Sequence, residues 1–562
     1  MQITSLFAAL AITKAAFGAK GPFLQQISSS QWIFGNDLWN LTQGPTYANN
    51  LQYQGSDAVG TAQGHYAGYD GESNLIFTSA AIVSNTSSYT DISFSSSLGD
   101  LHWVVYPDLA GAYQYFVNKA LPEISIFRTL WRLDPERFTH GYNTNKNEKL
   151  PDFSLYANAV EVQDETFLFP DGSYVTKYDF ANFVRERDFV GIYGSGTGSW
   201  YIHPTNEYQP GNHLSQTLTK VHRESATGDA VQLNVVQDTS HFRVGVKTVQ
   251  PVGKIWGPWL WYLNNGSLYD AHQRAAHERT TYPYAFLNNS AYHSRGSIKG
   301  KLTLSDGRPA AGAAIFLGDT DTSTRPLVQG SGYYYTTFAD AIGSFSISKL
   351  RSGSYGLIAA SNGGAIGDVY TNLTLSPITI AADKTTDLGS LTWSIPTKRR
   401  KIFQIGAFDK KATGLTNSGP HVHGLTEKSP ANLTFTVGTS TDADWYYASS
   451  KFGSWDVVFN TSLPRANDTA LLSVSLAGYS QSTALTIYLN GNKTIGTISK
   501  DTLASDPALY RSGTISGEWR FLQYEIPTES LREGRNVLSF KTERYTLWRG
   551  VLWDSVILEW VL

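Results

Sequence analysis

The sequence predicts an all-β protein made of three successive sandwiches: a large N-terminal β-sandwich, a small immunoglobulin-like sandwich and a C-terminal jelly roll. Aromatic residues make up 13% of the chain and charged residues only 16%. Short alternating segments recur between clusters of Gly, Ser, Asn and Asp, whereas long helical runs are nearly absent. The length of 562 residues also exceeds one ordinary domain.

The N-terminal residues predict a secretory signal peptide over residues 1–19. A short apolar stretch, Leu6–Ile12, is followed by small residues around Ala15 and Ala19, although no Lys or Arg precedes it. Asn-X-Ser/Thr acceptor sites are spread along the whole chain, which is expected of a secreted glycoprotein. These predicted glycosylation sites are Asn40, Asn85, Asn265, Asn288, Asn372, Asn432, Asn460, Asn467 and Asn492.

Residues 20–293 are predicted to form the large sandwich. Segments 89–94 and 101–106 alternate apolar and polar residues as half-buried strands do. One helix is expected, beginning near Ser267 and continuing through Ala271 to Ala276. Ser267, with Asp270 three residues later, is a typical helix N-terminus.

Two further domains are predicted, over residues 294–396 and 397–562. Regular short strands such as 296–304, 314–317, 344–348 and 355–359 indicate the small sandwich, which we interpret as a spacer. Beyond it, strand 485–489 precedes the turn Asn490–Gly491, and a last strand covers 556–558. Jelly rolls of this length bind sugar or pack on a catalytic domain.

Charge and cysteine content exclude several classes of function. The formal net charge is -3, and the longest basic run, Lys398–Lys401, is interpreted as a solvated linker, so no nucleic-acid partner is expected. An acidic polysaccharide is compatible with this net charge, because binding such a polymer requires only a local cluster of cations. The absence of cysteine removes thiol catalysis and disulfides. Beyond the N-terminal segment no apolar run is long enough to cross a bilayer, so no membrane partner is expected.

Most of the candidate functional residues lie between residues 162 and 265. The Gly-rich run 191–198 lacks the spacing of a nucleotide-binding loop and is predicted to be a hairpin or a close backbone approach. Trp256, Trp259 and Trp261 are either core aromatics or the lining of a sugar-binding cleft. Neither a metalloprotease His-Glu-x-x-His nor a Gly-x-Ser-x-Gly elbow occurs. Carboxylates that a glycosidase would need in pairs are present but cannot be paired from sequence: Glu165, Asp179, Asp188 and Glu207.

Six segments together resemble the rhamnogalacturonan endolyases of polysaccharide lyase family four, in their secreted fungal form. They are 162–166, 170–180, 262–266, 276–279, 401–406 and 444–447. The similarity covers roughly residues 30 to 562. It implies a large catalytic β-sandwich, a fibronectin-III-like middle domain and a carbohydrate-binding-like jelly roll, in agreement with the boundaries drawn above.

The resemblance also implies a reaction and residues that perform it. The family cleaves the α-1,4 bond between L-rhamnose and D-galacturonate by β-elimination, which needs a base for the C5 hydrogen, a donor for the departing O4 and a positive partner for the developing charge. By resemblance, Lys177 is the base, His213 the acid and Arg132 the partner of the uronate carboxylate. Tyr208 and Lys254 are expected to position substrate, and Tyr208 or water is the alternative proton donor.

Two other functions stay open at this stage. One is a hydrolase of the same polymer that uses two carboxylates, and the other is a wall-binding protein without catalysis. Rhamnogalacturonan I is the expected partner, and the chain is expected to be a secreted monomer. No cofactor is expected to be required; a structural calcium stays open, although no EF-hand-like acidic loop occurs. Endo or exo action cannot be read from the residues.

Overall fold

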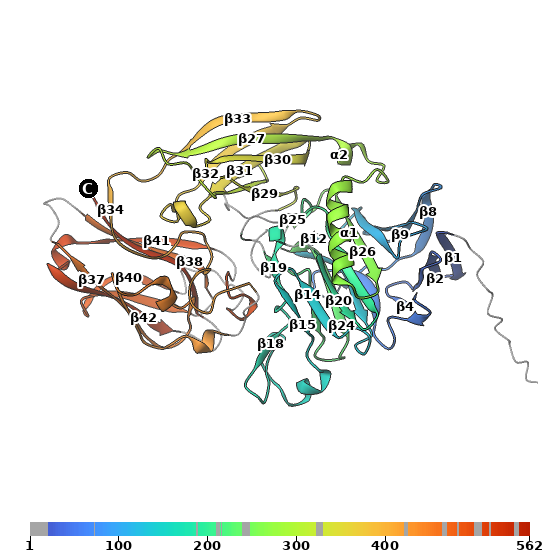
Figure 1. The fold of residues 1–562 in the computed structure, drawn as a ribbon, viewed down its shortest axis with the longest axis horizontal. Coiled ribbons are helices and arrows are strands. Elements are labelled where there is room, and N and C mark those ends of the chain that lie inside the picture. Colours follow the sequence, from blue (N-terminus) through green and yellow to red (C-terminus); the bar gives the residue numbers. More distant parts are fainter. Residues whose placement is uncertain are drawn as a thin grey trace, which may run out of the picture.

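The three-dimensional description rests on a computed structural model of the chain. It describes residues 21–71, 73–186, 189–209, 214, 216–238, 248–321, 330–420, 425–462, 469–479, 483–499, 509–515, 519–544 and 550–562. Strands account for 54% of the chain and helices for 8%, which confirms the predicted all-β class. Figure 1 shows three bodies, with the middle one lying across the other two.

The first body is a sandwich of a ten-stranded and a nine-stranded sheet. The ten-stranded sheet contains β1 (Phe23–Ser28), β2 (Gln31–Gly35), β3 (Trp39–Gln43), β4 (Ala48–Tyr53), β5 (Ser56–Asp57), β6 (Gly64–Tyr69), β7 (Ser73–Asn74), β13 (Ile126–Leu133), β23 (Lys220–Arg223) and β24 (Ala230–Asp238). The nine-stranded sheet contains β8 (Ser79–Asn85), β9 (Thr90–Ser95), β10 (Gly99–Val105), β11 (Gly111–Asn118), β14 (His140–Asn143), β15 (Lys146–Lys149), β20 (Phe189–Gly194), β21 (Thr197–Ile202) and β26 (Ile255–Asn264). The Gly-rich run forms the β20–β21 hairpin, as predicted.

Large aromatic side chains fill the space between these two sheets. Trp131 of β13 stacks on Trp261 of β26 with ring centroids 4.6 Å apart, which joins one sheet to the other. Trp256, Trp259 and Trp261 are all fully buried, so the core interpretation holds for all three. Each such ring removes a large apolar area from water, and this burial is the main force holding the sheets together.

Three small sheets and two helices complete the first body. The small sheets are formed by β12 (Glu123–Ile124) with β25 (Thr248–Val249), by β16 (Val160–Gln163), β17 (Thr166–Leu168) and β18 (Tyr174–Thr176), and by β19 (Asn182–Phe183) with β22 (Gln216–Thr217). Helix α1 (Leu268–Thr281) begins at the predicted cap, where the Ser267 side chain accepts from the Asp270 amide. It packs Ala271 and Ala275 against the nine-stranded sheet, and α2 (Ser290–His293) follows.

The second body consists of a three-stranded and a four-stranded sheet around one core. The first contains β27 (Arg295–Leu304), β30 (Ser344–Arg351) and β33 (Thr385–Trp393), and the second contains β28 (Ala314–Gly318), β29 (Tyr335–Phe338), β31 (Gly353–Ala360) and β32 (Leu373–Ile380). The strands predicted at 296–304, 314–317, 344–348 and 355–359 lie within β27, β28, β30 and β31.

The third body packs two five-stranded sheets face to face. One contains β34 (Arg399–Gly406), β36 (Ala448–Ser449), β38 (Thr469–Tyr479), β41 (Arg520–Ile526) and β43 (Val551–Val561), and the other β35 (Leu433–Thr436), β37 (Gly453–Thr461), β39 (Ala484–Leu489), β40 (Lys493–Ile498) and β42 (Gly534–Arg544). Asn490 and Gly491, with φ of 51° and 89°, form the predicted turn between β39 and β40.

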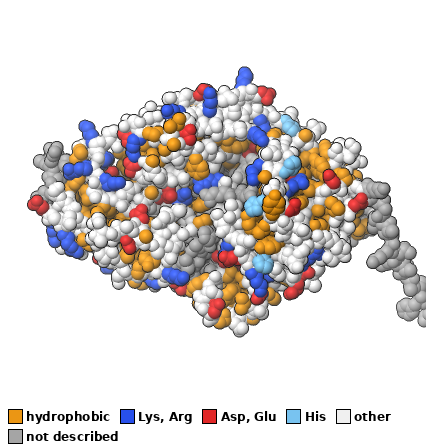
Figure 2. Space-filling model, viewed as in Figure 1, with side chains coloured by type: hydrophobic (Ala, Val, Ile, Leu, Met, Phe, Trp, Pro, Cys, Tyr) orange, Lys and Arg blue, Asp and Glu red, His pale blue; other side chains and the backbone are white. Residues whose placement is uncertain are grey.

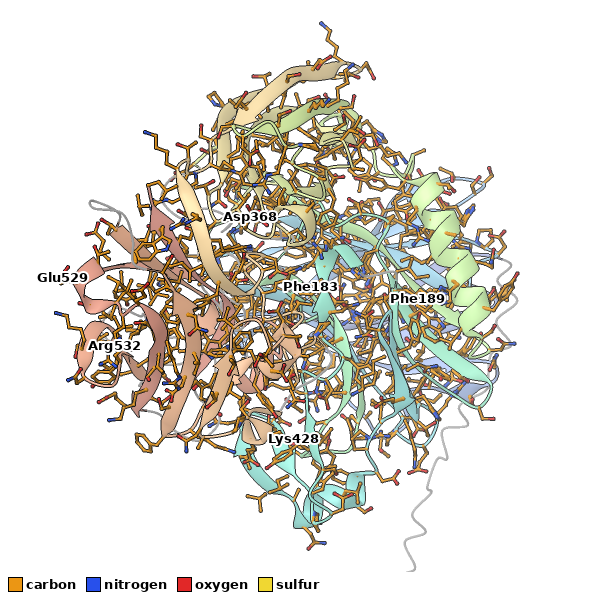
Figure 3. The ribbon with its side chains drawn as sticks, turned by 60° about the vertical axis from the view of Figure 1, so that its left-hand side comes forward. Phe183, Phe189, Asp368, Lys428, Glu529 and Arg532 are labelled. Carbon is orange, nitrogen blue, oxygen red and sulfur yellow. The ribbon has the colours of Figure 1, made fainter. Side chains whose placement is uncertain are left out.

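The third body also touches the first. Tyr174 donates a hydrogen bond to Oε2 of Glu427 at 2.5 Å, and Arg511 lies 3.4 Å from Oδ2 of Asp164. Lys411 lies 5.6 Å from the ring centre of Phe183, a residue that Figure 3 places between the two bodies. The sheet of β16, β17 and β18 therefore has neighbours on the third body.

The surface carries no extended basic stripe on the face in Figure 2, where Lys and Arg side chains are scattered among neutral and acidic ones. Among the described residues, no helix combines the length and apolar character that a membrane crossing requires.

The joint between the first two bodies centres on the buried carboxylate of Glu207. It accepts hydrogen bonds from both Nη atoms of Arg295 at 2.7 and 3.0 Å, from Nε of Arg351 at 2.7 Å and from the Tyr335 phenol at 3.1 Å. Burial opposes ionisation, but the charges and hydrogen bonds of the two guanidinium groups outweigh it and lower the pKa of Glu207 to about 2. Arg295 opens β27 and Arg351 closes β30, so the joint fixes both strands to the first body.

We expect the Glu207→Gln substitution to lower the free energy of unfolding by roughly 3 kcal/mol at neutral pH, because it leaves two buried guanidinium groups without their anion. The folded-state pKa of Glu207 lies below its ordinary value of 4.5. Its contribution is therefore complete above that value and is lost as the pH falls towards 2.

Denaturant unfolding of wild type and variant at several pH values measures both effects, and the difference should shrink in acid. Glu529→Gln is the matched control, since Glu529 is exposed at the outer edge of the third body (Figure 3). Equal stability of wild type and Glu207→Gln at neutral pH would contradict the role of the joint.

Candidate active site

A cavity of roughly 180 Å³ opens on the outer face of the ten-stranded sheet. Its base is formed by β6, β13, β24 and β23, which are neighbours in that sheet. The segment around β18 supplies the remaining wall. The lining side chains are Tyr66, Ile126, Arg128, Leu130, Arg132, Glu165, Lys177, Tyr178, Leu218, Lys220, His222, Glu224, Val231, Leu233 and Val235.

The alternation of a β-strand places these residues in the cavity. On β13, Arg128, Leu130 and Arg132 point to the cavity, whereas Trp131 and Leu133 on the opposite face belong to the aromatic core. Burial of the tryptophan face thus dictates which side chains face outward. The same period of two brings Lys220, His222 and Glu224 to the cavity from β23 and the residues that follow it.

Lys177 follows β18 directly and forms an ion pair with Asp164, with Nζ and Oδ1 2.7 Å apart. Its side chain is 23% exposed. Asp164 also accepts a hydrogen bond from the Tyr178 phenol at 2.8 Å. Partial burial disfavours the charge of Asp164, but Lys177, Tyr178 and Arg511 outweigh it and lower the pKa of this carboxyl to about 2. Asp164 therefore holds the amine of Lys177 in a fixed position at the cavity wall.

A second lysine, Lys220, lies behind the first. Its amine donates to the backbone carbonyl of Lys177 and lies 4.5 Å from the ring centre of Tyr178. Lys220 is fully buried, and this burial, reinforced by the charge of Lys177, holds its pKa well below the ordinary value. The cavity therefore contains two lysine amines in different environments, one accessible and one enclosed.

Arg132 lies at the other end of the cavity between two carboxylates. Its guanidinium is 2.8 Å from Oε2 of Glu224 and 3.3 Å from Oδ2 of Asp229, and it also bonds to the Tyr66 phenol. Nearby His222 has its pKa held well below the ordinary value by burial and then by the charges of Lys220, Lys177 and Arg132. An imidazole in this environment is neutral at physiological pH.

Basic side chains gather in the cavity. Two arginines and two lysines line it beside the carboxylates Glu165 and Glu224, and Asp164 and Asp229 pair with Lys177 and Arg132. Burial, with the charge of Glu224 as a further cause, raises the pKa of Glu165. Arginine and lysine side chains held in a concave site offer charge-assisted hydrogen bonds to an anionic ligand such as a polyuronate.

The structure brings Lys177 and Arg132 together in this cavity but places Tyr208 and Lys254 elsewhere. Tyr208 is fully buried against Trp259, with ring centroids 6.2 Å apart. Lys254 is buried near the second body, where its amine donates to Gln250 at 2.8 Å and to the carbonyl of Ser331 at 2.9 Å. Neither side chain reaches the cavity, so the predicted positioning roles of Tyr208 and Lys254 have no structural support.

His213, the predicted acid, lies outside the described residues. Sequence reasoning also missed Tyr66, Arg128, Lys220 and His222. The signal for two of them is the period of two over residues 218–224. It places three polar side chains, at 220, 222 and 224, on the same face of a strand as Leu218. No short segment of sequence predicts that Arg511 of the third body lies beside Asp164.

In the described ranges, no three His, Asp or Glu side chains lie close enough together to hold a metal ion. The calcium considered from the sequence stays an untested expectation.

Comparison with known proteins gives two family matches and several relatives. The model described as polysaccharide lyase family 4, domain III, CBM-like, matches residues 401–558, and that of domain II of the same family matches residues 305–388. A rhamnogalacturonate lyase of Dickeya dadantii is 30% identical over 477 residues, covering 82% of this chain and 78% of the relative. A probable rhamnogalacturonate lyase B of Aspergillus fumigatus is 24% identical over 526 residues, covering 83% and 74%. A probable rhamnogalacturonate lyase C of Aspergillus oryzae is 22% identical over 339 residues, covering 54% and 45%.

The location of Lys254 predicts that Lys254→Met keeps the rate of polymer cleavage within about threefold of wild type, since a substrate-binding lysine would be expected to cost far more. Burial lowers the pKa of Lys254 from 10.5 to about 7. Between these two values the unfolded chain binds a proton that the folded chain does not, so the wild type gains stability relative to the variant as the pH rises.

Unfolding free energies measured from neutral pH to about pH 10 test this slope. Lys299→Met, at an exposed lysine of β27, is the control variant. A large rise in KM for Lys254→Met would restore its role in substrate binding.

Proposed function

The chain belongs to polysaccharide lyase family 4, and from this membership we propose that its cavity lined by arginine and lysine cleaves rhamnogalacturonan by β-elimination. The observation that carries the assignment of the site is the meeting of Lys177, Lys220, Arg128 and Arg132 in one cavity. An elimination next to a carboxylate requires a base and positive charge at the same place.

The linkage joins L-rhamnose through the oxygen O4 to C4 of D-galacturonate, and the bond to be broken is C4–O4. A base removes the hydrogen on C5, and the electrons of that C–H bond form the C4–C5 double bond. The C4–O4 bond breaks, and O4 leaves with the rhamnose and takes up a proton. The products are an unsaturated galacturonate end and a new rhamnose end.

We assign the base to Lys177 rather than to Lys220 because of their different accessibility. The base must touch a carbon of a polymeric substrate, and only the amine of Lys177 belongs to a side chain with substantial exposure. The amine of Lys220 points to the backbone carbonyl of Lys177. Lys220 is therefore a positioning residue that fixes the segment carrying the base.

Arg132 is assigned to the uronate carboxylate, whose charge increases in the transition state. Its pairing with Glu224 and Asp229 orients the guanidinium, and the Tyr66 phenol at the same place offers a donor. His213 remains the predicted acid for O4. Tyr208, the earlier alternative, lies outside the cavity, so within the described residues Tyr66 is the phenol that we propose as an alternative proton donor.

A hydrolase is the second candidate, because Glu165 and Glu224 both line the cavity and the charge of Glu224 contributes to the raised pKa of Glu165. Glycoside hydrolysis uses such a pair, with one carboxyl protonated. Hydrolysis adds water and leaves no double bond, so the product separates the two reactions.

We further propose that the protein is secreted, glycosylated and monomeric. Support for secretion comes from the apolar N-terminal segment, which lies outside the described residues. Support for glycosylation comes from the acceptor asparagines other than Asn467, which are all at least partly exposed; Asn467 lies outside the described residues. Mass spectrometry of secreted protein, before and after removal of N-glycans, tests both points.

The ultraviolet absorbance of an unsaturated uronate, followed during incubation with rhamnogalacturonan I, tests the reaction. We expect a rise with wild type and a rate about a thousandfold lower with Lys177→Ala, because general base catalysis contributes on that order. Lys149→Ala, at an exposed lysine of the same body, is the control and should behave as wild type. New reducing ends without absorbance would indicate hydrolysis, and neither signal would favour a wall-binding protein.

The Lys220→Met variant distinguishes the role of Lys220 from that of Lys177. We expect kcat to fall on the order of tenfold with KM nearly unchanged, because the variant loosens the base without removing it. Steady-state kinetics and a thermal melt measure this against Lys177→Ala. If Lys220→Met abolished turnover as Lys177→Ala does, the base would have to be reassigned to Lys220.

A further inference from the structure

A second groove, of roughly 370 Å³, lies between the second and third bodies, far in sequence from the residues of the catalytic cavity. Figure 3 labels Asp368, one of its lining residues, where these two bodies meet. Its charged lining also includes Asp306, Arg308, Lys398, Arg399, Lys401 and Glu559. Three of these residues belong to the basic run 398–401, which the sequence predicted to be a solvated linker.

The pairing of β34 with β43 brings opposite charges to one face of this groove. Lys401 lies directly opposite Glu559, and Arg399, two residues earlier on β34, shares the same face. The Lys401 amine donates to Oε1 of Gln404, but three other polar atoms there, Nε and Nη1 of Arg399 and Oε2 of Glu559, are buried without a hydrogen-bond partner among the described residues. Buried donors and acceptors of this kind are normally paired, so their common location indicates a missing ligand.

A sugar hydroxyl satisfies both groups at once, since its oxygen accepts from a guanidinium and its hydrogen is donated to a carboxylate. The groove also offers an aromatic surface. The half-buried ring of Tyr370 stacks on Phe521 with centroids 4.9 Å apart and lies 5.5 Å from Phe408. A fixed aromatic ring suits the apolar C–H face of a pyranose.

The charges of the groove favour an acidic sugar over a neutral one. Arg308 is occupied by Asp306 at 2.7 Å and Asp368 at 2.9 Å. Counted together, four cations and three carboxylates line the groove, so its lining carries one net positive charge. A uronate carboxylate complements that charge and can accept charge-assisted hydrogen bonds from the guanidinium of Arg399.

We propose that this groove is a second polysaccharide-binding site, which holds a uronate-bearing segment of the polymer away from the catalytic cavity. The choice of polymer rests on the proposed function, whereas the site itself rests on the unpaired groups of Arg399 and Glu559. Neither residue falls within the segments matched by the family models, 305–388 and 401–558.

Calorimetric titration of the full chain with a homogalacturonan oligosaccharide tests the proposal. This probe bears uronates but lacks the rhamnose–galacturonate bond, so elimination at that bond does not consume it. We expect Arg399→Gln and Glu559→Gln each to weaken binding on the order of tenfold, the loss of one charge-assisted hydrogen bond. Arg532→Gln is the matched control, since Arg532 is exposed at the outer edge of the third body (Figure 3).

A parallel titration of Lys177→Ala, in which the groove is intact, separates this site from the catalytic cavity and should retain the affinity that Arg399→Gln loses. Cleavage of a short rhamnogalacturonan oligosaccharide should stay unchanged in Arg399→Gln, and thermal melts confirm that the variants fold. Wild-type affinity in both groove variants would overturn the site. Equal, Arg399-dependent binding of a neutral galactan would overturn its preference for uronates. Absence of any unsaturated product from wild type would overturn the proposed function but not the binding result.

Discussion

The placement of the second body on the first depends on one buried carboxylate. Glu207 lies in the loop after β21, yet its partners Arg295 and Arg351 terminate two strands of the second body. An ion removed from water is tolerated only where paired charges and hydrogen bonds replace the lost solvation, and here two guanidinium groups and phenols do so. The third body has its own contacts with the first, among them the Tyr174–Glu427 hydrogen bond and Arg511 beside Asp164.

The chemistry of the cavity follows from the division of each strand into two faces. The tryptophan side of the ten-stranded sheet must face the nine-stranded sheet, because that contact removes the largest apolar rings from water. Every second residue of β13, β24 and β23 then points outward; β13 and β23 place arginine, lysine and histidine at those positions, whereas β24 supplies Val231, Leu233 and Val235. A rigid, aromatic core on one face thus supports a charged site on the other, which is how a lyase can hold cations close together without collapse of the fold.

The same principle of unequal faces recurs at the junction of the second and third bodies. There β34 and β43 present charge to a groove on one face and apolar side chains to the jelly-roll core on the other. Two sites for one long, acidic polymer on separate bodies would raise the effective concentration of substrate at the cavity, provided that the bodies keep their relative placement. The buried joint at Glu207 is the element that supplies this rigidity.

The sequence by itself determined the all-β class, the positions of the strands named from it and the capped helix after Ser267, and its resemblance to a family pointed to two residues of the cavity, Lys177 and Arg132. Those features are local, since alternation, turn residues and caps are encoded within a few positions, and the motif around Lys177 is contiguous. Tertiary structure alone decided that Tyr208 and Lys254 are buried elsewhere, that Lys220 and Tyr66 join the cavity, and that the basic run at 398–401 lines a groove. Whether a polar side chain meets water, a ligand or a buried partner depends on which distant strands pack against it, and no short segment of sequence contains that information.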